Sequence, residues 1–183
     1  MMKKTTLLIL LIPFFQIASA QKYVTKNGHI KFYSETPMEN IEANNNQVNS
    51  AFDISTGDFV FKVLIKSFEF PKALMQEHFN ENYMESDKIP TATFTGTVLN
   101  FEGIDFLNDG TYDAMVKGKL SIHGVTKEVE HAGSFVIKGD AINAKAVFNV
   151  KPADYNIKIG GSVADKIAKE IEVSVDVNLI KLK

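Results

Sequence analysis

Alternation of apolar and polar residues is the feature that most constrains the fold of this chain. From Ile171 to Leu179 every second residue is Ile, Val or Leu, and the residues between them are Glu, Ser, Asp and Asn. Successive side chains of a β-strand point to opposite faces, so a period of two indicates a strand with one apolar face. Because similar alternation recurs from Ile30 onward, we expect an all-β chain.

The alternation occurs in eight stretches separated by turn-prone residues. Gly57, Gly110, Gly124 and Gly139 lie in the clearest hairpin-like turns, where Gly accepts the positive φ that a tight turn requires. We therefore predict eight antiparallel strands, with neighbours in the chain paired. Their expected bounds are Ile30–Glu35, Gln47–Ile54, Asp58–Lys66, Ala92–Phe101, Thr111–Ile122, Lys127–Ile137, Ala141–Val150 and Ile171–Leu182.

Three segments depart from this pattern. In Pro71–Tyr83 apolar residues recur at helical spacing among Gln, Glu and Asn, which predicts an amphipathic helix packed against the sheet. Gly161–Glu170 predicts a short helix before the last strand. The run Asn44–Asn46 predicts a polar bend.

Eight strands joined mainly by tight turns either close into a barrel or pack as a sandwich, because an open sheet would expose long edges. We favour the barrel. The predicted inward faces carry large apolar residues together with small ones such as Gly96, Ala114, Gly118 and Ala146. An unfilled eight-stranded barrel is just wide enough for one small ligand. Two alternatives stay open at this point: an apolar cavity, or an interior filled by Phe and Tyr rings.

Residues 1–20 have the three parts of a secretory signal peptide. Lys3 and Lys4 make the start positive, Leu7–Ile17 is largely apolar, and Ala18-Ser19-Ala20 provides small residues for cleavage. The apolar run is shorter than the roughly 20 residues that a membrane anchor needs. We expect cleavage near Ala20, a single domain over residues 21–183, and a periplasmic or secreted location.

The composition argues against several classes of function. The formal charge is -2, and all 20 cationic residues are Lys, so nothing favours binding to nucleic acid. The absence of Cys excludes thiol catalysis, disulfides and Cys-ligated zinc. The chain contains no nucleophile elbow, phosphate-binding loop or dinucleotide fingerprint. We expect no catalytic residue, no cofactor and no metal site.

The four His residues have no metal-ligand spacing. They are His29, His78, His123 and His131. By alternation, His131 faces the barrel interior together with Val129 and Phe135. It could meet the polar head of a ligand or satisfy a buried hydrogen bond, and we favour the hydrogen bond because buried polar groups need a partner.

The order of several motifs resembles that of the YceI-like family over essentially the whole of residues 21–183. The resemblance rests on K-S-F-E-F (66–70), A-L-M-Q-E-H-F-N-E-N-Y-M-E-S-D-K-I-P (73–90), T-A-T-F-T-G (91–96), D-G-T-Y-D-A (109–114), G-K-L-S-I-H-G-V-T-K (118–127) and A-D-Y-N-I (153–157). The segment Ser34–Ala43 further resembles the branch common in Bacteroidetes-type bacteria. Gly160-Gly161 is a departure, since relatives often carry Ile-Pro there.

The resemblance implies a lipocalin-like, eight-stranded antiparallel barrel with a helical insertion. It also implies an exported protein whose characterised relatives hold a long polyisoprenoid chain, and it implies no catalytic residue. Relatives in other branches often carry an Arg-Asp pair ahead of the helical segment, whereas this chain has Lys72–Met75 in that region. The polar contacts of those relatives are therefore not transferred to this chain.

An isoprenoid tail is apolar, and burying each of its CH2 groups contributes about 0.8 kcal/mol to binding. A tunnel lined by apolar side chains would provide this burial. Alternation and helix spacing predict which residues line it, with His131 or Tyr112 meeting a polar head. The predicted strand residues are Phe61, Ile65, Phe94, Tyr112, Val116, His131, Phe135, Phe148 and Val175. The residues expected to close one end are Phe68, Phe70, Leu74, Phe79 and Tyr83.

Three functions follow from these observations. The preferred one is a carrier of a long-chain isoprenoid or other amphipathic lipid, which binds without chemistry and makes at most transient contact with a membrane. The second is a stress-related or structural interaction domain with a filled barrel, in which Leu64, Met115 or the loop Phe101–Leu107 contacts a partner protein. The third is an isomerase or hydrolase that acts on a bound lipid through residues gathered from separate strands.

Overall fold

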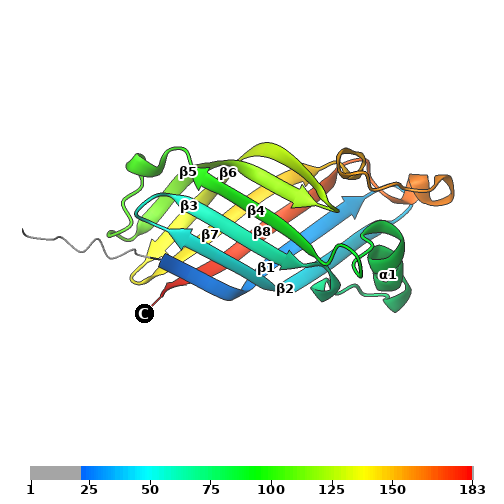
Figure 1. The fold of residues 1–183 in the computed structure, drawn as a ribbon, viewed down its shortest axis with the longest axis horizontal. Helices are drawn as coiled ribbons and strands as arrows, with labels where there is room; N and C mark the ends of the chain where they lie inside the picture. Colours follow the sequence, from blue (N-terminus) through cyan, green and yellow to red (C-terminus); the bar gives the residue numbers. More distant parts are fainter. Residues whose placement is uncertain (1–21, 183) are drawn as a thin grey trace, which may run out of the picture.

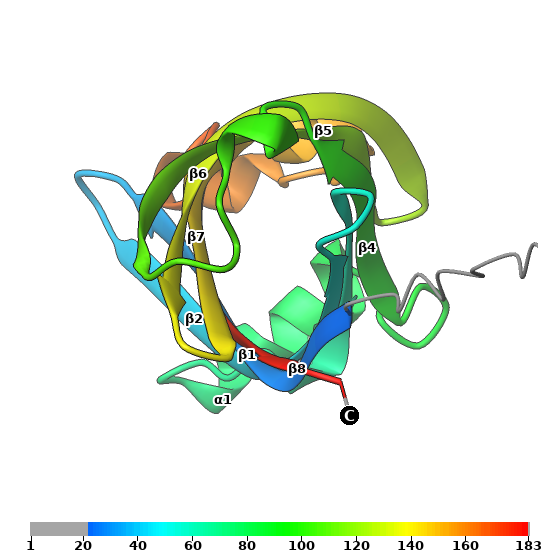
Figure 2. The ribbon, with the colours of Figure 1, turned by 90° about the vertical axis from the view of Figure 1, so that its left-hand side faces the viewer.

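The computed structural model describes residues 22–182, and the predicted signal peptide lies outside them. Eight antiparallel strands form a closed barrel in chain order, with β8 paired to β1 (Figures 1 and 2). The strands are β1 Lys22–Glu35, β2 Asn40–Asp53, β3 Asp58–Leu64, β4 Thr91–Val98, β5 Gly110–Ile122, β6 Val125–Lys138, β7 Ala141–Val150 and β8 Ile171–Lys181. The predicted fold class is confirmed.

Helical elements lie in the connections between strands. The predicted helical insertion is confirmed as the α-helix α1, Ala73–His78, which continues into the π-helical turn η2, Phe79–Tyr83. The predicted helix before the last strand is a 3₁₀ helix, η5, Gly161–Lys166. The other short 3₁₀ helices are η1 Ile65–Ser67, η3 Phe101–Gly103 and η4 Pro152–Tyr155.

The first two strands begin earlier than predicted, β1 at Lys22 and β2 at Asn40. Irregular pairing of β1 with β2 on both sides of Gly28 interrupts the alternation there, so the period of two is not visible before Ile30. A Cβ at Gly28 would come within 2.6 Å of the Val177 side chain, which explains a Gly at this irregular position.

The predicted polar bend at Asn44–Asn46 is wrong, because these residues lie inside β2. The Asn45 side chain is fully buried, and its amide nitrogen donates to the carbonyl oxygen of Leu64 at 2.9 Å. Its amide oxygen accepts from the backbone N–H of Gln47 at 2.9 Å. Buried polar groups with partners are compatible with a strand, so the Asn run does not break it.

Three of the predicted tight turns are confirmed by left-handed backbone at Gly57, at His123 with Gly124, and at Gly139. The predicted hairpin at Asn108–Gly110 is wrong. Residues 99–109 instead form a long connection between β4 and β5 that contains η3. β3 and β4 also end earlier than predicted, because η1 and η3 follow them.

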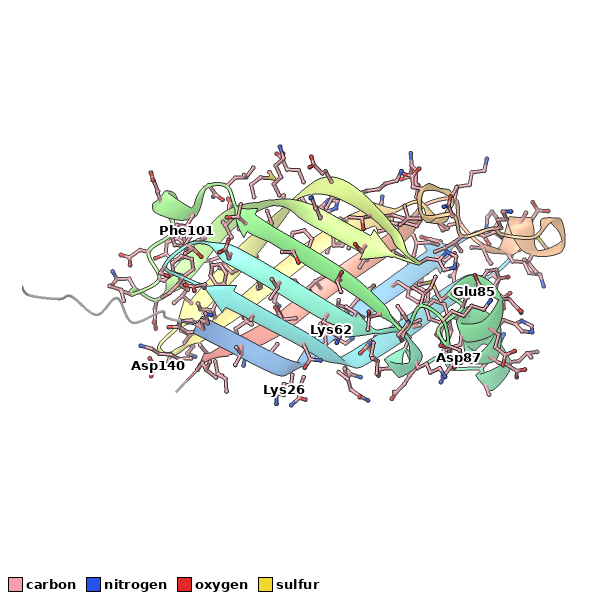
Figure 3. All side chains as sticks on the ribbon, in the orientation of Figure 1. Lys26, Lys62, Glu85, Asp87, Phe101 and Asp140 are labelled. Carbon is pink, nitrogen blue, oxygen red and sulfur yellow. The ribbon has the colours of Figure 1, made fainter. Side chains whose placement is uncertain are left out.

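One half of the barrel interior is packed with aromatic rings. Phe52 lies at the centre of this packed core, with ring centroids 5.0 Å from Phe59, 5.3 Å from Phe106 and 5.1 Å from Phe135. The connection 99–109 covers this end and contributes Phe106 from outside the strands. Figure 3 shows Phe101, which packs against the same core, at the end of the barrel opposite α1.

The paired glycines of β4 and β5 have a different role from the predicted one. Gly96 pairs with Gly118, and a Cβ at either position would clash with the backbone of the other strand. The Phe94 ring would also lie within 3 Å of such a Cβ, so it covers both glycines. These glycines allow close approach of the strands and leave no empty space, whereas Ala92, Ala114 and Ala146 do line cavities.

Candidate functional site

The other half of the barrel, at the end beside α1, contains an apolar cavity of about 560 Å³. We call it the mouth cavity. Strand residues such as Phe32 and Val173 form its walls, and the segments 65–84 and 152–167 form its rim. Leu74 belongs to this rim and is 61% exposed, so solvent reaches the cavity there.

A second cavity of about 120 Å³, the deep cavity, lies further inside the barrel. Its walls include the small residues Ala114, Gly133 and Ala146, and two rings of the packed core, Phe59 and Phe135, border it. The two cavities share five wall residues. These are Ile30, Val63, Ala92, Leu120 and Phe148. Both alternatives for the interior are therefore realised, a hollow in one half and a filled core in the other.

The structure brings together all but one of the predicted lining residues. Those in the wall or rim of the mouth cavity are Ile65, Phe68, Phe70, Leu74, Phe79, Tyr83 and Phe148. Those in the wall of the deep cavity are Phe61, Phe94, Val116, His131, Phe135, Phe148 and Val175. Tyr112 is the exception: it packs against the core at the covered end, and its hydroxyl donates to the carbonyl oxygen of Asn108 at 3.3 Å.

Several cavity residues are missing from the sequence prediction. Phe32 on β1 contacts three Phe rings of the segment 65–84, at centroid distances of 5.3 Å to Phe68, 5.6 Å to Phe70 and 5.4 Å to Phe79. This four-ring cluster joins the helical segment to the barrel wall. The segment 152–167 adds Ile157, Ile159, Val163 and Ile167. The four large aliphatic residues of this segment are the signal that could have identified them.

His131 is a polar side chain in the wall of the deep cavity. Its ring stacks on Phe148 with centroids 4.2 Å apart and an angle of 17° between the planes. Among the described residues the ring makes this stack and no side-chain hydrogen bond, so the structure does not bear out the predicted buried hydrogen bond. Burial lowers the pKa of His131, which favours the neutral ring.

His123 connects the rim segment 152–167 to Glu85, the residue that directly follows the rim segment 65–84. Its Nδ1 lies 3.1 Å from the carbonyl oxygen of Tyr155, and its Nε2 lies 3.3 Å from Oε2 of Glu85 (Figure 3 shows Glu85 beside α1). A backbone carbonyl only accepts hydrogen bonds, and so does an ionised carboxylate. For both bonds to form together, both ring nitrogens of His123 must donate, and only the protonated imidazolium has two N–H groups. Hydrogen bonds from Lys88 and then from His123 lower the pKa of the Glu85 carboxyl.

Further polar contacts hold the rim segments to the barrel. Lys72 pairs with Glu39 at 3.2 Å on one side of the rim. On the other side, the backbone N–H of Ala168 donates to the buried hydroxyl of Ser34 at 2.9 Å. The rim is therefore polar outside and apolar inside.

The side chains of the described residues offer little for metal chemistry. Within residues 22–182, no three His, Asp or Glu side chains are grouped closely enough to hold a metal ion. Over the same range, none of the helices has the length and apolar character needed to cross a membrane.

The fold places the chain in the class of closed up-and-down β-barrels, whose eight-stranded members are wide enough to be filled by side chains or to hold one small ligand. Within this class, residues 15–179 match the YceI-like domain, and the chain belongs to the YceI-like family. No curated protein matches the chain.

Solved structures of low sequence identity share the fold. A polyisoprenoid binding domain from Saccharophagus degradans, implicated in plant cell wall breakdown, is 12% identical with a TM-score of 0.77, over 90% of this chain and 100% of that one. Burkholderia cenocepacia BcnA is 16% identical with a TM-score of 0.69, over 83% and 95%. The Campylobacter jejuni YCEI protein is 17% identical with a TM-score of 0.56, over 100% and 99%.

Proposed function

We propose that this protein binds a polyisoprenoid or related amphipathic lipid in the mouth cavity and carries it without catalysis. The observation that carries the proposal is the apolar cavity of about 560 Å³ at one end of the barrel. Pockets for small molecules generally measure about 300–1,000 Å³ and are mostly apolar. Similarity in fold to a polyisoprenoid binding domain from Saccharophagus degradans supports this choice of ligand.

The energetics favour an apolar tail in the cavity. Burying ten CH2 groups contributes roughly 8 kcal/mol at about 0.8 kcal/mol each. Immobilising the ligand costs an estimated 4–15 kcal/mol, so the tail must bury more than ten groups for tight binding. A long isoprenoid tail meets this condition, and a small polar metabolite does not.

The distribution of polar groups favours one orientation of the lipid. Lys72, His78 and Lys166 belong to the rim of the mouth cavity, and Glu39 pairs with Lys72 there, whereas the shared wall between the cavities is apolar. We therefore place the tail in the barrel and the polar head at the rim. The thirteen predicted residues that line the two cavities would contact the tail, and Tyr112 would not.

The proposal extends to location. Residues 1–20 carry the features of a signal peptide, so we propose a periplasmic or secreted protein of residues 21–183. An export compartment suits a lipid carrier, and the exposed Leu74 at the rim supports transient contact with a membrane during loading. Membership of the Bacteroidetes-type branch is a hypothesis that rests on Ser34–Ala43 alone and draws no support from the compared relatives.

A single introduced Trp tests the proposal, because the chain contains no Trp. Phe148→Trp places the indole in the wall shared by both cavities, and we expect its fluorescence to change on addition of geranylgeraniol. Val147→Trp is the matched control, because Val147 is the adjacent residue and is 62% exposed. Equal responses of the two variants, or no response of Phe148→Trp, would contradict binding in the cavity.

A further inference from the structure

The hollow part of the barrel has a closed inner end. The deep cavity stops at Phe59 and Phe135, and behind these rings lies Phe52, whose centroid is 5.0 Å from Phe59 and 5.1 Å from Phe135. Phe106 closes the same stack from the far side, 5.9 Å from Phe135. A tail that enters at the rim therefore meets a packed floor inside the barrel and does not emerge at the opposite end.

The two volumes set how many carbon atoms fit above this floor. A cavity of about 150 Å³ holds one benzene, which corresponds to about 25 Å³ per carbon atom. On this scale the mouth cavity of about 560 Å³ accepts on the order of 20 carbon atoms. The deep cavity of about 120 Å³ accepts roughly five more, the size of one isoprene unit.

We infer that this barrel selects lipids by tail length, with room for about 20–25 carbon atoms between the rim and the floor formed by Phe59 and Phe135. The inference rests on the proposed function and adds a limit to it. Each CH2 group gains burial only while space remains above the floor. Beyond that length, further isoprene units stay outside the barrel in water.

The small side chains around the deep cavity control its depth. Ala146 lines this cavity, and Leu at this position would add three carbon atoms to its interior. At about 25 Å³ per carbon, these atoms would occupy more than half of the deep cavity. Ala146→Leu should therefore exclude the last isoprene unit while leaving the mouth cavity unchanged.

Ala132 offers a matched control for this substitution. It lies on β6 next to His131, but its side chain is exposed on the outer face. Ala132→Leu adds the same three carbon atoms outside the barrel and should not alter ligand length.

The test measures binding of all-trans prenols of 10 to 45 carbon atoms to the purified protein. The protein is incubated with an equimolar mixture of these prenols in detergent, and excess lipid is then removed. Mass spectrometry quantifies each prenol that stays bound to the protein. Affinity should rise by about fourfold per CH2 group and then stay level beyond about 25 carbon atoms. In the Ala146→Leu variant, affinity should reach its plateau at a tail about one isoprene unit shorter than in the wild type. In the Ala132→Leu variant, the plateau should begin at the same tail length as in the wild type.

The outcomes separate the length limit from the proposed function. Retention that continues to rise up to 45 carbon atoms, or a limit that Ala146→Leu fails to move, would overturn length selection while leaving lipid binding in place. Retention of no prenol by the folded wild-type protein would overturn both.

Discussion

Removing one of two Phe rings should distinguish the packed half of the barrel from the hollow half. Phe135 is 1% exposed and contacts Phe52, Phe59 and Phe106. Phe148 is half-buried in the wall shared by the two cavities. Substitution by Ala therefore leaves a void among the packed rings that form the floor of the deep cavity at Phe135, whereas at Phe148 it enlarges the wall region shared by the two cavities.

The expected losses of unfolding free energy differ clearly. Phe135→Ala should cost about 3–5 kcal/mol, because the lost burial and the new cavity both contribute. Phe148→Ala should cost about 1–2 kcal/mol, since its half-buried ring borders the cavities on one side and therefore makes fewer packing contacts. With a urea m-value of about 2 kcal/mol/M, Phe135→Ala should lower the midpoint by roughly 2 M, and Phe148→Ala by less than half as much.

Urea unfolding followed by far-UV circular dichroism provides the measurement. Binding of geranylgeraniol completes the comparison, because Phe148→Ala should weaken binding more than its small effect on stability would suggest. Equal losses of stability in the two variants would refute the division into a packed half and a hollow half. If Phe135→Ala unfolds, Phe135→Leu provides a milder version of the same comparison.

Three further predictions concern the barrel wall and the rim. Gly96→Ala should lower the unfolding free energy by about 1–3 kcal/mol in urea titrations, because its Cβ would clash with the adjacent strand. Asn45→Leu should cost roughly 2 kcal/mol in the same assay, because it removes the fully buried Asn45 amide and leaves the carbonyl of Leu64 without this donor. Glu85 has a lowered pKa, so its stabilising contribution, present near neutral pH, should disappear as acidification protonates it. Glu85→Gln should therefore flatten this acid-induced fall in Tm, whereas an unchanged pH profile would exclude a stabilising contribution of the Glu85 carboxylate through its contacts with Lys88 and His123.

Much of the barrel could be predicted because its strands alternate strictly. β8 illustrates this: Val177 and Leu179 are fully buried, while Asn178 between them is exposed. Alternation predicted neither the start of β1 before Gly28 nor the strand conformation of Asn45, because the irregular pairing and the buried amide both depend on a neighbouring strand. Periodicity within one strand contains no information about such partners.

The candidate site could be predicted where one face of a strand or helix determines it. Phe61 and Phe94 face inward by alternation, and Phe79 faces the cavity by helix spacing. Tyr112 shares the inward face of its strand but lies where the connection 99–109 fills the barrel. Which half of a barrel is filled depends on loop packing, which alternation does not reveal.

The connections at the rim were the least predictable part. His123 was expected only as a turn residue, yet it joins Glu85, 38 residues away, to Tyr155, 32 residues away. Ser34 and Ala168 meet across 134 residues. These contacts form only when the barrel closes, so no local sequence pattern predicts them.

Native mass spectrometry of the protein, purified after expression of the full chain, tests the central claim most directly. The account predicts a population that is heavier than the polypeptide by one lipid, and organic solvent should extract a lipid whose tail has at least about 20 carbon atoms. The added mass should disappear on extraction and return on incubation with geranylgeraniol. Bare polypeptide alone, both as purified and after this incubation, would contradict the account.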